Sequence, residues 1–432
     1  MTAETAPPAS PATPPATRTP ATPPATRKGY LDWLRGAAVI VMIQGHAVDS
    51  WTRLDDKPEA AYRWISMTWG IAAPLFLFLA GVSLVLAAGA RLRQGRTDAE
   101  AAALARRRGL QIFGLAFLFR LQAWLISGGA AYRTLLKVDI LNVMGLAMLA
   151  GAILWGLGRG QRSRALLLAG AAVAAAMLTP IVRATPLLAP LPDPIEWYLR
   201  PFAGATTFTL LPWAGFLLAG GAVGFWIDSA RTVRDERVVN GSLAIVGTLL
   251  AVGGYAASLL PPIYEQTNFW TSSPTFFFLR LGLVIACVPL AFAINADRKG
   301  PRRILETRDL DEQEIRNVRR GPSRSAKLRS AMQDFGRSSL FVYWIHVEMA
   351  YGIFSAPIHR RLPVEWAMVG WALLTLLLFG LVKVKGRLER HHVGHLRDHR
   401  AAQHLARALV PAFVIHKEEI AQRTVNDVEP QV

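Results

Sequence analysis

The sequence has little cysteine and little charge for its length. Cys287 is the only cysteine among 432 residues, so no disulfide can form within the chain. Charged residues make up 18% of the chain and hydrophobic residues 52%. A soluble protein of this length usually carries more charge, about a quarter of its residues. These scarcities exclude a disulfide-stapled domain and argue against an ordinary soluble protein.

Familiar catalytic motifs are also missing. The sequence contains no zinc-binding spacing, nucleotide-binding loop, nucleophile elbow or redox motif. The net charge of +18 comes without the interleaved aromatic and basic residues of a nucleic-acid platform. In a membrane protein, excess Lys and Arg gathers in the cytoplasmic loops. We therefore interpret the charge as a sign of topology and expect no nucleic-acid partner.

Apolar runs of about 20 residues, the length needed to cross ~30 Å of hydrocarbon, recur along the chain. We predict an all-α integral membrane protein of the cell (inner or plasma) membrane. About ten transmembrane helices are expected, at 31–52, 65–90, 109–128, 138–158, 165–183, 206–227, 241–260, 276–294, 337–356 and 365–385. Lys and Arg are concentrated in alternate loops, which places both termini in the cytoplasm.

The two ends of the chain differ in composition from this transmembrane domain, 29–386. Residues 1–28 form a Pro/Ala/Thr tract that has nothing to bury, and we expect a disordered cytoplasmic tail. Residues 387–432 are expected to form a basic, histidine-containing cytoplasmic tail. Three of its histidines recur every fourth residue: His391, His395 and His399. No Asp, Glu or Cys completes a recognised spacing, so we favour a solvated helix and predict no metal site.

The first apolar run contains four ionisable residues. Each costs about 2.5–3.5 kcal/mol at the centre of a membrane helix. Asp32 precedes Arg35 by three residues, and Asp49 follows His46 by three. Arg35 and His46 are eleven positions apart, which leaves only about 20° between them around a helix. All four therefore lie on one side of the predicted helix, as a polar stripe.

The positions of these residues along the helix indicate different roles for its two ends. Arg35 and His46 are about 16 Å apart along the helix axis. Arg35 is expected near the cytoplasmic boundary, where a guanidinium can hold an anionic group such as phosphate. His46 lies deeper, and Asp49 is one turn beyond it, placed to fix the imidazole tautomer. The alternative is a stripe of interhelical hydrogen bonds, with Arg35 snorkelling to water.

Other predicted spans add polar residues. His346 and Glu348 lie in the ninth span, Arg280 lies in the eighth, and Arg120 and Gln122 lie in the third. Lys137, Asp139 and Asn142 open the fourth span, where Asp139 and Arg120 can also form a purely structural ion pair. Deep histidines with flanking carboxylates and a cationic entrance fit acid/base chemistry or nucleophilic acyl transfer.

The sequence resembles the transmembrane acyltransferases. "LDWLRGAAVIVMIQGH" is similar to a first-helix signature, Leu-Asp-x-x-Arg-Gly with His eleven residues after Arg, of the acyltransferase 3 branch. "GIAAPLFLFLAGVSLVL" at 70–86 resembles the Pro-x-Phe-x-Phe-x-x-Gly-x-Ser segment of the heparan-alpha-glucosaminide N-acetyltransferase-like branch. Three later blocks are similar to that branch in the expected order: "KVDILNVMGLAML", "LLPWAGFLLAGGAVG" and "GRSSLFVYWIH".

This resemblance implies transfer of an acyl group, usually acetyl, from cytoplasmic acyl-CoA to an extracytoplasmic sugar hydroxyl or amine. By the resemblance, His46 is the catalytic histidine, as general base or transient acetyl carrier, and Arg35 helps to hold the donor. There is one departure from the pattern. The heparan-type enzymes place an essential histidine in the loop after the first helix, and residues 53–69 contain none. The reaction is therefore stated only as acyl transfer.

We predict a membrane acyltransferase with acetyl-CoA, or another acyl-CoA, as co-substrate and a glycan or other small molecule as acceptor, surrounded by membrane lipids. A proton-coupled secondary transporter is the alternative, although the two halves show no inverted-repeat symmetry. A catalytically inactive scaffold is the third possibility. The candidate catalytic residues are His46, Asp49, His346 and Glu348. The candidate donor-binding residues are Arg35, Asp32, Arg120, Asp139 and Asn142.

Overall fold

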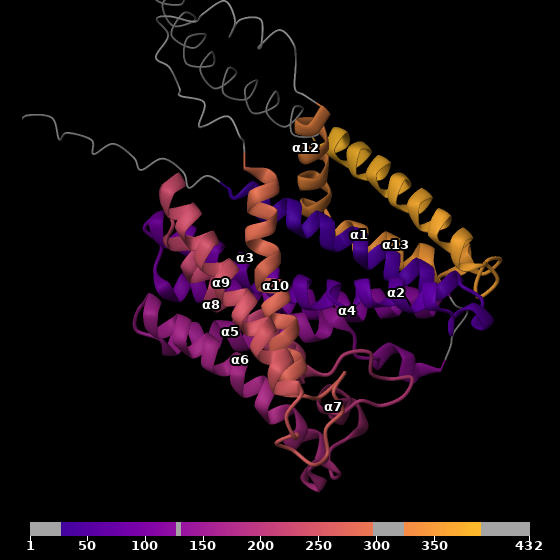
Figure 1. Cartoon of the computed structure of the whole chain (residues 1–432), viewed down its shortest axis with the longest axis horizontal. Coiled ribbons are helices and arrows are strands. Elements are labelled where there is room, and N and C mark those ends of the chain that lie inside the picture. Colours follow the sequence, from indigo (N-terminus) through magenta and orange to yellow (C-terminus); the bar gives the residue numbers. More distant parts are fainter. Residues whose placement is uncertain (1–26, 127–130, 297–323, 390–432) are drawn as a thin grey trace, which may run out of the picture.

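A computed structural model describes residues 27–126, 131–296 and 324–389 (Figure 1). Most of the predicted N-terminal tail and nearly all of the predicted C-terminal tail lie outside these ranges. The C-terminal histidines considered for a metal site lie outside them too. Among the described residues, no group of three or more His, Cys, Asp or Glu side chains is arranged to hold a metal ion.

The described residues form helices, with no strand beyond two isolated bridges, Thr52 to Leu362 and Val138 to Thr206. The long helices are α1 (Gly29–Trp51), α3 (Ala72–Arg93), α4 (Asp98–Ile126), α5 (Ile140–Leu157), α6 (Gln161–Ala184), α8 (Leu210–Ser229), α9 (Val233–Ser258), α10 (Pro274–Asn295) and a last helix, Val364–Glu389. The shorter ones are α2 (Ala60–Trp69), α7 (Asp193–Leu199), α12 (Arg324–Arg337) and α13 (Ser339–Tyr351). Four 3₁₀ turns complete the list: η1 (Leu54–Asp56), η2 (Tyr132–Leu136), η3 (Pro186–Leu188) and η4 (Ile353–Ser355).

Eight stretches of the described residues are long and apolar enough to cross a membrane. They are α2 with α3 as one stretch, α4, α5, α6, α8, α9, α10 and the last helix. The prediction of an all-α integral membrane protein is thereby confirmed. The two other predicted spans coincide with α1, which carries the polar stripe, and with α13, which has only 13 residues. The total of ten spans and the side of each terminus stay predictions.

Glycines allow the helices nearest the site to touch through their backbones. A Cβ atom at Gly81 of α3 or Gly220 of α8 would collide with the backbone of the opposite helix. The same holds for Gly36 of α1 and Gly336 of α12. Small residues at such crossings are the usual way in which membrane helices pack closely. These two crossings fix α3 against α8 and α1 against α12.

Helix α1 separates two apolar clusters. Leu34 and Ala38 of α1 pack into a cluster built mainly from α3, α4, α5, α6, α8 and α10. Val39 and Ile43 pack into a second cluster with α12, α13 and the last helix. In Figure 1, α1, α13 and the last helix lie together on one side, apart from α5, α6, α8 and α9. The apolar side chains of α1 are thus divided between the two clusters, and its polar stripe faces the space between them.

Candidate active site

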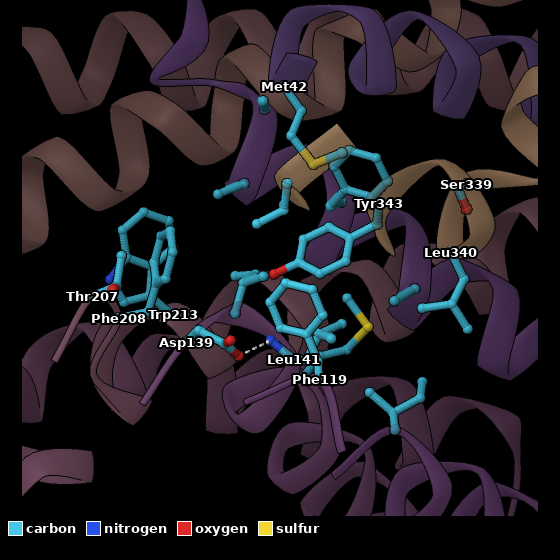
Figure 2. A pocket seen from close by; sticks show the side chains of 18 of the residues that line it. Met42, Phe119, Asp139, Leu141, Thr207, Phe208, Trp213, Ser339, Leu340 and Tyr343 are labelled. Atoms are coloured by element: carbon cyan, nitrogen blue, oxygen red, sulfur yellow. Dashed lines mark hydrogen bonds between the residues drawn. The ribbon is translucent and has the colours of Figure 1, made fainter. Parts of the chain in front are cut away.

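A cavity of about 1860 Å³ borders both clusters. Its walls come from α1, α3, α4, α5, α10, α12 and α13, and from the segment before α8. Figure 2 shows Phe208 and Trp213 on one side of it, Ser339 and Leu340 on the other, and the ring of Tyr343 between them. Ligand pockets usually measure about 300–1,000 Å³. This cavity therefore has room for a large ligand or for two substrates together.

The polar stripe of α1 lines this cavity. Arg35, Met42, Gly45, His46 and Asp49 all contribute to the wall. The span from the first to the last of these is about 21 Å along the helix. The cavity thus follows α1 for about four turns and connects the guanidinium at one end of the helix with the imidazole and carboxylate near the other.

One end of the cavity is lined by four arginines, and we call it the arginine end: Arg35, Arg107, Arg108 and Arg337. Asp32 does not line the cavity but organises this end, because its carboxylate is 4% exposed and accepts hydrogen bonds from Arg27, Arg35 and Arg337. One negative charge thus faces three guanidinium groups. The resulting excess of positive charge suits an anionic ligand.

The guanidinium of Arg35 is also held by α3. Its Nη2 donates a hydrogen bond of 2.5 Å to Ser83 Oγ, and Ser83 in turn donates to the Leu79 carbonyl. Ser83 is the serine of the Pro-x-Phe-x-Phe-x-x-Gly-x-Ser segment, and Gly81 of the same segment makes the contact with α8. That segment therefore both packs α3 and positions Arg35. The segment was recognisable in the sequence, but no role for Ser83 was predicted from it.

A pair of histidines lies further along α1. His46 Nδ1 is 3.1 Å from His346 Nε2, and the two rings are stacked with centroids 5.0 Å apart. His346 is fully buried on α13, and its Nδ1 is 2.8 Å from the Val342 carbonyl. His46 lines the cavity, whereas His346 does not. The structure thus brings together two candidate residues that are 300 positions apart in the chain.

These contacts fix the tautomers of both rings in their neutral form. A carbonyl oxygen only accepts, so His346 Nδ1 must carry the proton that it shares with Val342. His346 Nε2 is then unprotonated and accepts from His46 Nδ1–H. The remaining nitrogen of His46, Nε2, is left with a lone pair and with no hydrogen-bonding partner among the described residues. That lone pair can act as a base or a nucleophile.

Asp49 lines the cavity, as His46 does, but its carboxylate does not have the predicted hydrogen-bonding partner. Its carboxylate accepts hydrogen bonds of 2.8 Å from Lys57 Nζ and from the Tyr62 hydroxyl, and its side chain is 47% exposed. The His46 nitrogen that Asp49 was expected to orient is bonded to His346 instead. The triad-like role of Asp49 is therefore corrected. The segment after α1 brings Lys57 and Tyr62 back onto the carboxylate, which hydrogen-bonds to them and not to the ring.

Glu348 is on α13 and lines the same cavity. Its carboxylate has no hydrogen-bonding partner among the described residues, and Gly352 lies against it. Tyr351 also lines the cavity, with its ring 5.5 Å from that of His46 in an edge-to-face arrangement. We call this region, from His46 to Glu348 and Tyr351, the far end of the cavity.

The remaining candidates form a structural cap that faces the cavity. Asp139 caps the N-terminus of α5 by accepting from the backbone N–H groups of Leu141 and Asn142. Its carboxylate also accepts a hydrogen bond of 2.9 Å from Arg120 Nη2. Asn142 donates to the hydroxyl of Tyr198, whose pKa is raised by burial. Arg120 and Asp139 line the cavity and Asn142 does not. The structural ion pair of Arg120 and Asp139, the alternative considered from the sequence, is present.

Comparison with known proteins identifies the family. The model of the heparan-alpha-glucosaminide N-acetyltransferase catalytic domain matches residues 27–260, more than half of the chain. The chain belongs to this family. No curated protein matches it. The matched residues run from before α1 to just after α9, so they include Arg35, Ser83 and His46, whereas His346 and Arg280 follow them.

Membership of the heparan-alpha-glucosaminide N-acetyltransferase family makes the chain a multi-pass membrane protein of an acetyltransferase family. The resemblance to the heparan-alpha-glucosaminide N-acetyltransferase-like branch is thereby confirmed, whereas the Arg/His pattern of the first helix stays a prediction. The alternative of a proton-coupled transporter gains no support from this match.

Proposed function

We propose that this protein moves an acetyl group from acetyl-CoA, bound at the arginine end, to an acceptor that enters from the far end. The observation that carries the proposal is the histidine pair. His46 presents a lone pair to a cavity that also reaches the four arginines of the arginine end. The donor enters from the cytoplasm, and the acceptor is a hydroxyl or amine of an extracytoplasmic glycan.

The arginine end suits the donor. Acyl-CoA carries phosphates at one extremity and the thioester at the other, joined by a long arm. Arg35 and Arg337, held by Asp32, supply fixed guanidinium groups for the phosphates. The arm then follows α1 past Met42 and Tyr343, and the thioester arrives beside His46 about 16 Å from Arg35.

Two chemical routes use the same lone pair. In the direct route, the acceptor oxygen or nitrogen attacks the thioester carbon and loses its proton to His46 Nε2. The C–S bond breaks, and the CoA thiolate leaves with that proton. In the two-step route, His46 Nε2 attacks the thioester carbon and expels the thiolate. The acceptor then attacks the acetyl carbon, the bond from that carbon to Nε2 breaks, and the acceptor's proton goes to the CoA thiolate, which leaves the ring neutral. In both routes His346 Nε2 accepts from His46 Nδ1–H and stabilises the positive charge that develops on the ring.

The test is acetyl transfer by the purified protein. Radiolabelled acetyl-CoA is supplied with a panel of neutral, amino and acidic sugars, and label on each sugar is counted. Wild type is expected to label at least one sugar, and His46→Ala to lose about 10²–10⁴-fold in rate. His359→Ala is the matched control, because His359 bonds Ser50 outside the cavity and should leave the rate unchanged. Equal rates for wild type and His46→Ala would remove His46 from the reaction.

A further inference from the structure

A smaller cavity of about 180 Å³ adjoins the main one. Thr207, Trp213, Trp270 and Arg280 line both cavities, so the two are neighbours. Arg183, at the C-terminal end of α6, lines only the smaller one. A water molecule takes about 30 Å³ in the liquid. The side cavity therefore has room for one small charged group of a ligand that extends into the main cavity.

The two arginines of the side cavity have no acidic partner among the described residues. The Arg280 guanidinium lies 4.0 Å from the centroid of the Phe276 ring. Arg183 Nη2 donates to Thr209 Oγ1 at 3.0 Å, but the Arg183 Nε is buried without a hydrogen-bonding partner. Both arginines are half-buried, and partial removal of a guanidinium from water without an anion costs free energy. Both side chains are thus arranged for an anion that is not part of the described chain.

The surroundings of Arg280 suit a sugar that carries this anion. Trp213 and Trp270 give flat apolar surfaces where the cavities meet, and Figure 2 shows Trp213 beside Phe208 at this side of the main cavity. Five residues with hydroxyl groups also line the side cavity, along with prolines and phenylalanines: Thr206, Thr207, Thr209, Thr271 and Ser273. Flat apolar faces combined with hydroxyl groups match a ring that has one polar edge and one apolar face.

Arg280 also lies toward the transfer side of the cavity. Its Nη2 is 3.5 Å from the place that a Cβ atom would take at Gly70. The neighbouring Trp69 packs on Gly45, which directly precedes His46. A ligand anchored on Arg280 is therefore next to the segment that packs on α1 beside His46, whereas Arg35 of the arginine end lies about three turns further toward the start of α1.

We propose that Arg280 and Arg183 form a subsite for an oxyanion, a carboxylate or phosphate group, on the sugar acceptor. Arg280 anchors the anion from the main cavity and Arg183 from within the side cavity, so that a hydroxyl or amine of the same molecule faces His46. The identification of the ligand as the acceptor rests on the proposed function. The binding of an acidic sugar by the two arginines does not.

The test is direct binding, without any acetyl transfer. The protein is placed in phosphatidylcholine nanodiscs, and dissociation constants are measured for methyl glucuronide, glucose 6-phosphate and neutral methyl glucoside. At least one of the two acidic sugars is expected to bind more tightly than methyl glucoside. Arg280→Gln is expected to weaken that binding about 10- to 100-fold, Arg183→Gln to weaken it less, and Arg280→Lys to retain part of it. Arg162→Gln, an exposed arginine at the other end of α6, is the matched control and should change nothing.

Three results overturn the subsite. The first is equal binding of acidic and neutral sugars by wild type. The second is unchanged binding in an Arg280→Gln protein that elutes and melts as wild type does. The third is Arg280-dependent displacement of the sugars by phosphatidylglycerol in the nanodisc, because the ligand is then a lipid headgroup. Binding that depends on Arg280 in a protein that transfers no acetyl group supports the subsite while removing the proposed function.

Discussion

The two ends of the cavity handle positive charge in different ways. At the arginine end, Arg35 and Arg337 share the buried carboxylate of Asp32. Beside the far end, Arg183 and Arg280 have no carboxylate partner among the described residues. Guanidinium groups that are already held by a carboxylate can bind a ligand's phosphates without moving. Guanidinium groups without a carboxylate are neutralised only when an anionic ligand binds. The difference indicates a preformed donor site and an acceptor site that its ligand completes.

The histidine pair stands between these ends, and breaking it should have the largest effect. His346→Phe removes the acceptor of His46 Nδ1–H, so the ring loses its fixed tautomer. We expect kcat to fall about 10²–10⁴-fold. The KM for acetyl-CoA should stay unchanged, because His346 does not line the cavity. Steady-state kinetics with wild type alongside measure both constants.

His346→Gln provides the control for that loss. Its amide oxygen is able to accept a hydrogen bond, so part of the lost kcat should return. Equal rates for the Phe and Gln variants, at equal melting temperature, would show that His346 only packs against His46.

Removal of the shared carboxylate at the arginine end should have the next largest effect. Asp32→Asn leaves three guanidinium groups without their buried counter-charge, and loss of one partner of a buried pair costs about 3–5 kcal/mol. Thermal unfolding in detergent measures the loss. Asp334→Asn is the matched control, since Asp334 is 56% exposed and its one ion pair among the described residues is with Arg337, where about 1 kcal/mol or less is expected. Similar losses in the two variants would contradict the role of Asp32 as organiser.

Variants at the two ends of the cavity should affect different substrates, Arg35→Gln the donor and Arg280→Gln the acceptor. Arg35→Gln should raise the KM for acetyl-CoA about 10- to 100-fold through loss of a charge-assisted contact, and should leave the binding of acidic sugars unchanged. Arg280→Gln should do the reverse. Initial-rate kinetics with each substrate varied in turn give the four constants. A rise in the KM for acetyl-CoA in both variants would mean that the donor occupies the whole cavity.

The smallest effect is expected for Asp49. Its carboxylate is half exposed and bonded to Lys57 and Tyr62, so Asp49→Asn should lower kcat less than tenfold and stability by about 1 kcal/mol or less. The same kinetic and unfolding measurements apply. A loss of kcat as large as that of His346→Phe would restore the triad-like role that the structure has corrected.

Much of this arrangement follows from local sequence. Helical periodicity places Arg35, His46 and Asp49 on one face of α1, and all three line the cavity. Arg120 and Asp139 are 19 residues apart, across a single connection between α4 and α5, so their ion pair was foreseeable. Apolar runs also located the helices, because a helix is the structure in which a single segment satisfies its own backbone in lipid.

The rest depended on contacts between distant segments. The partner of His46 is 300 residues away, and no local pattern pairs α1 with α13. Asp49 was misassigned because spacing along α1 takes no account of Lys57 and Tyr62, which fold back onto its carboxylate. The ninth span came out short because α13 ends at Tyr351, and the 3₁₀ turn η4 follows in place of further helix. The sequence did not single out Arg183, because its lack of an acidic partner among the described residues appears only in the folded structure.

The central claim is that one cavity joins a donor on one side of the membrane to an acceptor on the other, with His46 between them. The most direct measurement traps a sugar acceptor inside sealed vesicles that contain the protein and supplies radiolabelled acetyl-CoA outside. The account predicts label on the trapped sugar with wild type and about 10²–10⁴-fold less with His46→Ala. Label that appears only on sugar placed on the same side as acetyl-CoA would contradict it.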